Sequence, residues 1–365
     1  MQKYYILAIN PGSTSTKIAV FMNEKKILSE TINHSVKDLS GFNSIMDQRD
    51  FRAGLVLDFL DKCEIPISKL SAIIGRGGML TPMRSGTYKV NNDMVDFLIN
   101  NLLEHASSLG AIIADLVAKK IGVKAYIVDP VVVDEMDPIA KITGIPEIRR
   151  VSIFHALNQK AAAREAAKKL KIKYREGNFI VAHLGGGITV GAHKRGKVVD
   201  VNNGLNGDGP FSPERVGSAP TWSIIEWATT GLYSLPELKK RITGKGGIVA
   251  HLGTNDMREV KARIENGDRK AERVYKAMAY NISKEIGAMA PVLDGKVNAV
   301  VITGGLAFDK EFVSLIKNRI KYISPVIVLP GEDEMAALAK GGLRVLRGEE
   351  HSKIWRKKET VNGSN

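Results

Sequence analysis

Short apolar runs separated by polar turns recur along the chain, and the first of them predicts a β-hairpin. An apolar strand at 6–9 leads into the turn 10–17, after which a second apolar strand returns beside the first. Backbone N–H groups of such a glycine-containing turn can approach an anion closely, while Ser13, Ser15 and Lys17 offer hydroxyls and a positive charge. Taken alone, such a turn is most often only a turn. The alternative is a phosphate-binding hairpin.

The same order of strands and glycine-rich turns occurs a second time. Residues 178–199 again read as strand, glycine-rich turn, strand, basic turn and strand. Downstream, 71–78 is matched by 298–305, and 125–130 is matched by 325–330. Three matched pairs in the same order indicate a duplicated domain. We therefore expect an α/β protein with an N-terminal domain and a similar C-terminal domain.

Helical periodicity fills the spaces between these strands. Helices are expected at 50–62, from about 156 to 170, at 221–231, 234–242 and 255–293, and from 334 to 346. The segment 200–220 is dense in glycine and proline, and such long loops are usually functional or mobile. We place the first domain at 1–150, completed by part of the C-terminal segment 334–365, and the second domain at 151–333.

Composition narrows the class of protein. The 365 residues are 44% apolar, which supports packed cores, and their formal net charge is +14. We expect no nucleic-acid partner, because no basic-aromatic interleaving is present. No apolar run suits a membrane span and the start lacks signal-peptide anatomy. With a single cysteine, Cys63, these features favour a cytoplasmic protein.

Polar residues at predicted strand ends are the candidates for chemistry. Arg76 and Asp129 each follow an apolar strand, where open α/β sheets place ligands, although Arg76 could instead pair with a local acid. His105 lies at a helix start among small residues, and is either structural or near a ligand. Glu334 belongs to an acidic helix start, where helix capping and metal coordination are both possible.

Seven motifs together resemble one enzyme family. They are NPGSTSTK (10–17), EHASSLG (104–110), VDPVVVDE (128–135), IFHALNQ (153–159), HLGGG (183–187), GDGPFSPER (207–215) and TGGL (303–306). This set resembles the butyrate kinases of the acetate kinase family, which belong to the actin, hexokinase and Hsp70 ATPase superfamily. The resemblance implies two duplicated ribonuclease H-like domains of the actin-like ATPase fold, with an active-site cleft between them.

The resemblance also implies roles for individual residues. The residues that would bind the nucleotide and its phosphates are Asn10, Ser13, Ser15, Lys17, His183, Gly185, Gly186, Gly187, Gly304 and Gly305. The residues that would take part in catalysis are Arg76, His155, Arg215 and Asp129, and Asp129 and Glu334 would orient Mg²⁺ through water. The residues that would bind the acyl group are His105, Phe154, Pro210, Gly77 and Gly78. ATP and a small carboxylic acid are the implied substrates, and a homo-oligomer is expected.

Two departures from the acetate kinases bear on substrate choice. Gly186 replaces an asparagine, so one side-chain contact to phosphate is missing. Gly77 and Gly78 replace bulky valines, and we expect the lost bulk to enlarge the acyl pocket toward four-carbon acids. The predicted reaction is direct attack of the carboxylate on the γ-phosphorus of ATP. A sugar or glycerol kinase with Asp129 as base, and a non-catalytic Hsp70-like or actin-like switch, are the alternatives.

Overall fold

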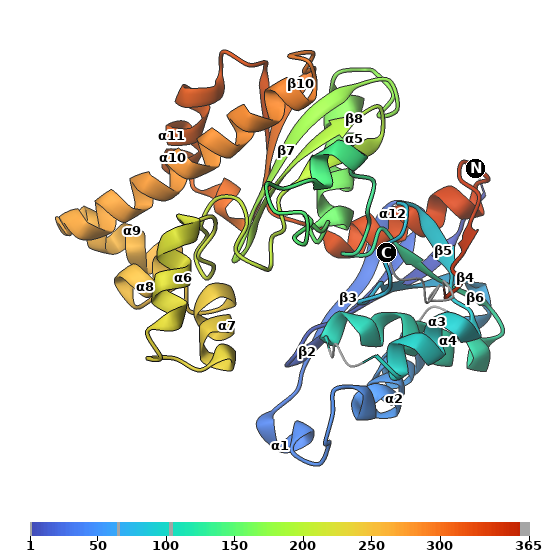
Figure 1. The fold of residues 1–365 in the computed structure, drawn as a ribbon. Helices are drawn as coiled ribbons and strands as arrows, with labels where there is room; N and C mark the ends of the chain where they lie inside the picture. Colours follow the sequence, from blue (N-terminus) through green and yellow to red (C-terminus); the bar gives the residue numbers. More distant parts are fainter. Residues whose placement is uncertain (1, 64–65, 102–104, 358–365) are drawn as a thin grey trace. The chain divides into compact units, whose positions relative to one another are not determined.

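The structure is a computed structural model that describes residues 2–63, 66–101 and 105–357 (Figure 1). The chain divides into two compact units, here called unit 1 (Met1–Val133 and Asp333–Asn365) and unit 2 (Asp134–Glu332). Residues 134–150, which sequence analysis assigned to the first domain, group with unit 2. Their backbone explains this, because Asp137 N–H donates to Val199 O at 2.9 Å and the Arg150 guanidinium donates to Val201 O at 3.1 Å.

Unit 1 is built on a seven-stranded sheet in the order β12-β5-β6-β4-β1-β2-β3. Its strands are β1 (Tyr5–Pro11), β2 (Ser15–Met22), β3 (Lys25–Asn33), β4 (Leu70–Arg76), β5 (Thr87–Lys89), β6 (Lys124–Val128) and β12 (Lys353–Ile354). β1 and β2 are antiparallel, with Ile9 opposite Ile18, which confirms the predicted hairpin. The strands extend into the predicted turn, so the turn itself is only residues 12–14.

Helices cover both faces of the unit 1 sheet. They are α1 (Val36–Leu39), α2 (Arg49–Asp61), α3 (Asn92–Ile99), α4 (Leu109–Ile121) and α12 (Glu334–Leu346), with short 3₁₀ turns η1 (Met46–Gln48), η2 (Ile67–Lys69) and η3 (Ala106–Ser108). Side chains alternate along a strand, so Leu7 and Ile9 of β1 share a core with α2 and α4. Ile74 faces the other way, and a Cβ on Gly342 of α12 would lie 2.4 Å from it. Close packing of α12 therefore requires glycine at this position.

Unit 2 repeats this plan with a five-stranded sheet in the order β11-β10-β7-β8-β9. Its strands are β7 (Asn178–Leu184), β8 (Ile188–Lys194), β9 (Lys197–Val201), β10 (Ala299–Gly304) and β11 (Val326–Pro330). Its helices are α5 (Ala156–Lys169), α6 (Thr221–Thr229), α7 (Leu235–Thr243), α8 (Gly247–Leu252), α9 (Met257–Glu265), α10 (Arg269–Val292) and α11 (Lys310–Ile320), with 3₁₀ turns η4 (Pro138–Lys141) and η5 (Gly305–Phe308). The single helix expected at 255–293 is two helices, because Gly267 adopts φ +86° and ends α9.

The two sheets share an order of equivalent strands, which confirms the predicted duplication. β6-β4-β1-β2-β3 in unit 1 corresponds to β11-β10-β7-β8-β9 in unit 2, with the same parallel and antiparallel pairs. The tight turns after the second strands also match, since Asn23 and Arg195 both adopt the left-handed conformation (φ 54° and 49°). In unit 2 the alanine-rich face of α5 covers one side of the sheet, while α10 and α11 cover the other.

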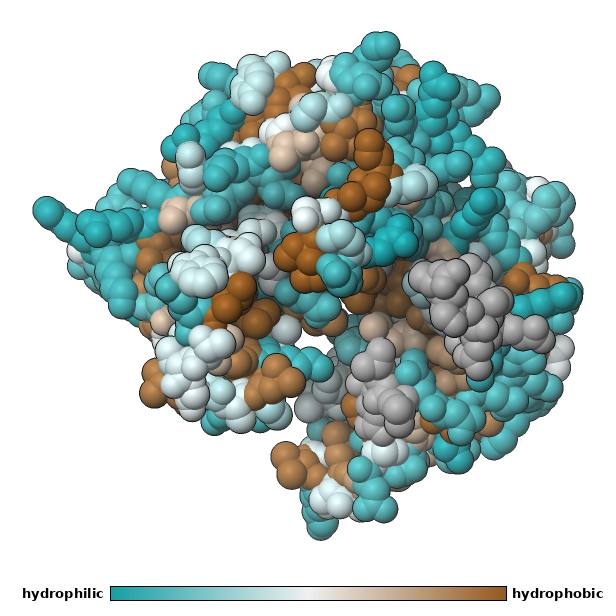
Figure 2. Space-filling view, in the orientation of Figure 1, coloured by the Kyte–Doolittle hydropathy of each residue, from teal (hydrophilic) through white to brown (hydrophobic). Residues whose placement is uncertain are grey.

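The helices α6 and α7 carry apolar side chains on the surface. Figure 2 shows brown, hydrophobic patches over this region, and Trp222, Leu232 and Leu235 are 68%, 71% and 80% exposed. Throughout the described residues, none of the helices combines the length and apolar character that crossing a membrane requires.

Candidate active site

A buried arginine of α2 holds the hairpin turn of unit 1 in place. Arg52 of α2 is fully buried, and its guanidinium donates to the backbone oxygens of Gly12 (2.8 Å), Ser15 (3.0 Å) and Ser13 (3.0 Å). These carbonyls therefore point toward α2, while the side chains of Ser13 and Lys17 are exposed. Carbonyl oxygens that repel an anion are thus turned away from the solvent side of the loop, where phosphate would bind.

Sequence reasoning missed Arg52, although a signal was present. Buried side chains of α2 recur at 52, 53, 56, 59 and 60, the spacing of a core-facing helix stripe. An arginine on such a stripe must find hydrogen-bond acceptors inside the protein, because burial of an unpaired charge is costly. Its acceptors here are the loop carbonyls.

Three predicted residues meet at one end of the unit 1 sheet. Asn10 is near the end of β1, Arg76 ends β4, and Glu334 is the first residue of α12. The Glu334 carboxylate accepts hydrogen bonds from Asn10 Nδ2 and from Arg76 Nη1. Arg76 and Glu334 are only 13% and 19% exposed at their side chains, so the pair is largely shielded from water. Arg76 therefore pairs with an acid of its own unit, which was the alternative to ligand binding for this residue.

Asp129 and His105 lie in the same unit. Asp129 follows β6 in a left-handed conformation (φ 38°), is 1% exposed, and accepts a hydrogen bond from Gly86 N–H at 2.7 Å. His105 is the N-cap of η3, and its Nδ1 accepts from Ser107 N–H at 3.2 Å. Residues 102–104 of the motif around His105 lie outside the described residues.

The packing at Gly77 and Gly78 corrects the expectation of an enlarged pocket there. Both glycines are buried. A Cβ on Gly77 would lie 2.7 Å from Pro130 Cβ, and a Cβ on Gly78 would lie 2.3 Å from Ser108 Cα. Pro130 and Ser108 occupy the volume that larger side chains would need. The glycines allow close backbone packing and do not leave open space.

In unit 2, two predicted histidines stack on each other. His155 is the N-cap residue of α5 and His183 is near the end of β7, with ring centroids 4.1 Å apart and planes inclined by 25°. His155 Nδ1 lies 3.0 Å from Thr189 Oγ1, and His183 Nε2 lies 3.3 Å from Glu332 Oε2. The structure therefore brings together a helix start and the second glycine-rich turn.

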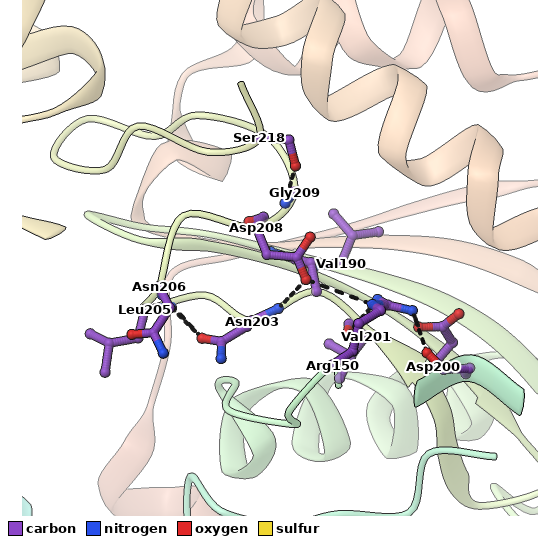
Figure 3. A network of polar contacts seen from close by, with 12 residues as sticks. Arg150, Val190, Asp200, Val201, Asn203, Leu205, Asn206, Asp208, Gly209 and Ser218 are labelled. Atoms are coloured by element: carbon purple, nitrogen blue, oxygen red, sulfur yellow. Dashed lines mark hydrogen bonds and ion pairs between the residues drawn. The ribbon is translucent and has the colours of Figure 1, made fainter. Parts of the chain in front are cut away.

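The loop that carries Pro210 and Arg215 is fixed by polar contacts (Figure 3). Arg150 Nη1 lies 2.9 Å from Asp200 Oδ1, and Asn203 N–H donates to Asp208 Oδ2 at 3.0 Å. Gly209 N–H then donates to Ser218 Oγ at 3.0 Å, which closes the segment containing Pro210. These contacts hold a region that the sequence identified only as a long irregular loop.

Arg215 lies against the glycine-rich turn between β7 and β8. A Cβ on Gly187 would lie 2.1 Å from Arg215 Nη1, and Nη1 donates to Gly204 O. Burial lowers the pKa of Arg215, while the nearby Glu214 raises it. Its buried Nε has no hydrogen-bond partner among the described residues. A guanidinium held in this way can bind an anion on its remaining face.

The other predicted residues of unit 2 differ in accessibility. Gly304 is buried, adopts φ 93° and packs against Leu184, where a Cβ would lie 2.4 Å from the Leu184 oxygen. Gly305 is exposed and faces open space. Phe154 and Pro210 are buried. The predicted residues thus form one set in each unit.

Comparison with known proteins decides the family. The sequence profile described as "Acetokinase family" matches residues 141–353, which is more than half of the chain. The chain belongs to the acetokinase family. Members of this family are ATP-dependent carboxylate kinases.

Solved structures of the acetokinase family and of sugar kinases share the fold. The acetate kinase of Porphyromonas gingivalis is 18% identical with a TM-score of 0.79, and the match covers 94% of this chain and 100% of that one. A propionate kinase from Francisella tularensis is 21% identical with a TM-score of 0.71, covering 93% and 98%. A putative N-acetylmannosamine kinase from Listeria monocytogenes is 14% identical with a TM-score of 0.51, covering 95% and 100%. The acetokinase chain therefore has the duplicated actin-like ATPase fold.

The donor set of this acetokinase suits a metal that keeps most of its water. Within the described residues, no three histidine, cysteine, aspartate or glutamate side chains are grouped as metal ligands. Mg²⁺ commonly binds through one or two carboxylates together with water and substrate phosphates. Asp129 and Glu334 of unit 1 supply two carboxylates, so the residues present fit such a metal.

Proposed function

We propose that this protein is a butyrate kinase, a kinase of short-chain fatty acids, straight or branched, that converts ATP and butyrate into ADP and butyryl phosphate. The observation that carries the proposal is the Arg215 guanidinium, which lies against Gly187 of the second glycine-rich turn. A fixed cation beside a phosphate-binding turn is suited to the negative charge of a transferring phosphoryl group. Arg76, which holds the Glu334 carboxylate, is our candidate for the substrate carboxylate.

The chemistry requires charge stabilisation and no general base. A carboxylic acid has a pKa of about 4 to 5 and is already ionised at neutral pH. The barrier arises from repulsion between two anions, which Arg76, Arg215, His155 and Lys17 would reduce. We infer direct in-line transfer, so labelled ATP should leave no phosphorylated enzyme. Isolation of a labelled, acid-stable or hydroxylamine-sensitive phosphoenzyme would contradict this mechanism.

The surroundings of Asp129 argue against a sugar kinase. Such an enzyme needs an aspartate that removes a proton from a hydroxyl group. Asp129 is 1% exposed and accepts a hydrogen bond from Gly86 N–H, which leaves it poorly suited to reach a polyol. We assign Asp129 instead, with Glu334, to orienting Mg²⁺ through water. The bound metal would neutralise charge on the phosphates.

The remaining sites follow the same assignment. We assign ATP phosphates to the two turns, with Asn10, Ser13, Ser15 and Lys17 in the first and His183, Gly185, Gly186 and Gly187 in the second. We assign the adenosine to the turn at Gly304 and Gly305, and the acyl chain to His105, Phe154 and Pro210. We also propose a cytoplasmic homo-oligomer, which the exposed apolar side chains of α6 and α7 support.

A chain-length series tests the substrate. ATP-dependent hydroxamate formation would be measured with acetate, propionate, butyrate, isobutyrate and isovalerate, with glycerol as control. Each buried methylene is worth about 0.8 kcal/mol, so two of them favour butyrate over acetate by about tenfold in kcat/KM. A preference for acetate would refute butyrate specificity, and phosphorylation of glycerol without any acid would refute the carboxylate kinase.

A further inference from the structure

Behind His155, a row of polar side chains runs into unit 2 and reaches a fully buried histidine. Thr189, Gly191 and His193 are alternate residues of β8, so they lie on one face of the sheet. On α5, Gln159 follows His155 by one helical turn and therefore lies on the same side of the helix. The side chains of Thr189, Gln159 and His193 are 0% exposed.

Four short contacts join these side chains into one chain. Tyr174 Oη lies 2.8 Å from His193 Nδ1, and His193 Nε2 lies 3.0 Å from Gln159 Oε1. Gln159 Nε2 lies 2.8 Å from Thr189 Oγ1, which lies 3.0 Å from His155 Nδ1. All four distances are in the normal range for hydrogen bonds. The chain is therefore continuous from Tyr174 to His155.

The direction of each hydrogen bond follows from one backbone contact. Gln159 Nε2 also donates to the backbone oxygen of Thr189 at 3.0 Å, and a carbonyl oxygen can only accept. The amide orientation is thus fixed, so Gln159 Oε1 must accept from His193 Nε2–H. Thr189 Oγ1 receives the second Gln159 donor, and since His155 Nδ1 is its other partner among the described residues, the buried hydroxyl gives its own hydrogen to Nδ1. The proton of the neutral His155 ring then lies on Nε2.

Two further features keep this arrangement in place. Burial lowers the pKa of His193 well below its usual value, and the positive charges of Lys160 and Arg164 lower it further, so His193 is neutral. Gly191 provides the space for the Gln159 amide, because a Cβ at this position would lie 2.6 Å from Gln159 Oε1. Larger residues at 191 would displace the amide from the sheet.

We propose that Thr189, Gln159 and His193 are positioning residues that hold the His155 imidazole as the neutral Nε2–H tautomer. This inference rests on the proposed function, in which His155 contacts the reacting groups. His155 then acts as a neutral N–H donor toward oxygen atoms of the phosphoryl or acyl group. All donors of the chain point the same way, and such chains strengthen one another. The chain orients His155 and transfers no proton, because the Gln159 amide holds its own hydrogens.

Nitrogen-15 NMR of the histidine rings tests the tautomer without any activity measurement. In the full-length wild-type protein, His155 and His193 should each show a protonated Nε2 and an unprotonated, hydrogen-bonded Nδ1. In Thr189→Val the two ring nitrogens of His155 should shift toward each other as both tautomers become populated. A proton on His155 Nδ1 in the wild type, or an unchanged His155 spectrum in Thr189→Val, would overturn the proposal.

Kinetics provide the second measurement, with a conservative variant as control. Thr189→Val should lower kcat about tenfold or more while KM for ATP changes less than about twofold. Thr189→Ser keeps the hydroxyl and should recover kcat to within about threefold of the wild type. Equal kcat in Thr189→Val and the wild type would refute the positioning role. Full activity of His155→Ala beside the expected NMR spectra would instead refute the proposed role of His155 and leave the tautomer assignment standing.

Discussion

The guanidinium of Arg215 occupies the position that a side chain on Gly187 would need. A Cβ built on Gly187 would lie 2.1 Å from Nη1 and 2.5 Å from the central guanidinium carbon. Real Cβ atoms do not approach other atoms this closely, so a side chain at this position would require the Arg215 guanidinium to shift. The glycine-rich sequence of the second turn thus serves to seat a cation as well as to expose backbone N–H groups.

Gly187→Ala should therefore displace Arg215 and reduce activity. We expect kcat to fall by about 10²- to 10³-fold, as for loss of one donor that stabilises transition-state charge. Steady-state kinetics and circular dichroism would measure the effect in a folded protein. Gly54→Ala is the matched control, because a Cβ on Gly54 of α2 meets nothing within 4 Å. That variant should keep full activity and gain about 0.5–1 kcal/mol in stability.

Arg52→Met should destabilise unit 1 through its first turn. The substitution removes the guanidinium donors to the backbone oxygens of Gly12, Ser13 and Ser15, and it also removes the partner of the buried Gln48 side chain. We expect the free energy of unfolding to fall by about 3–5 kcal/mol in urea titrations. Arg49→Ala, which removes only a surface ion pair with Asp50, should change it by less than about 0.5 kcal/mol. Equal stability of both variants would contradict the structural role of Arg52.

Glu285 should make stability depend on pH. Burial and then charge repulsion from Asp208 and Asp200 raise its pKa to about 7, while Arg150 and Lys284 oppose the shift. The folded protein then binds a proton that the unfolded chain has released, so stability falls as pH rises from about 4.5 toward about 7. In Glu285→Gln, the decrease in the free energy of unfolding between these pH values should be smaller by about 2 kcal/mol.

Urea titrations at a series of pH values check the Glu285 prediction. Glu226→Gln on the exposed face of α6 is the control and should follow the wild type at every pH. Parallel curves for Glu285→Gln and the wild type would show that the Glu285 carboxyl titrates normally.

Glu334→Gln should keep the hydrogen-bonding capacity of this side chain and remove its negative charge. The amide oxygen can still accept from one donor, but the negative charge that holds Arg76 and would bind a metal is lost. We expect the Mg²⁺ concentration for half-maximal activity to rise about tenfold or more. Glu349→Gln, near the C-terminal end of the same helix, should leave it unchanged. An unaltered Mg²⁺ requirement in Glu334→Gln would remove Glu334 from the metal site.

Much of the fold could be predicted, because the repeated sequence patterns indicate the duplication and the hydrophobic periodicity indicates the helices and strands. The matched runs at 71–78 and 298–305 become β4 and β10, in equivalent positions of the two sheets. The grouping of 134–150 with unit 2 could not be predicted, since it depends on contacts with β9. The break at Gly267 has a local cause, because a glycine with positive φ ends α9 and the Asp268 side chain caps α10, so this signal was present in the sequence and was missed.

The residue types of the candidate site could be predicted, whereas the residues that hold them in place could not. Motifs identify Arg76, Arg215 and His155, yet the partners that hold them come from distant segments. Thr189 and Gln159 look like ordinary strand and helix residues in the sequence, and only their side-by-side placement connects them with His155. At Gly77 and Gly78 the sequence indicates missing bulk, whereas Pro130 and Ser108 occupy that volume.

The position of α12 has a consequence for how the chain folds during synthesis. α12 packs through Gly341 and Gly342 against Val128 and Ile74, so it forms part of the core of unit 1. A ribosome makes all of unit 2 before it makes this helix, which means that unit 2 can fold while the sheet of unit 1 still lacks one of its covering layers. The apolar face of that early sheet stays uncovered until α12 has been made, which exposes it to aggregation for that time.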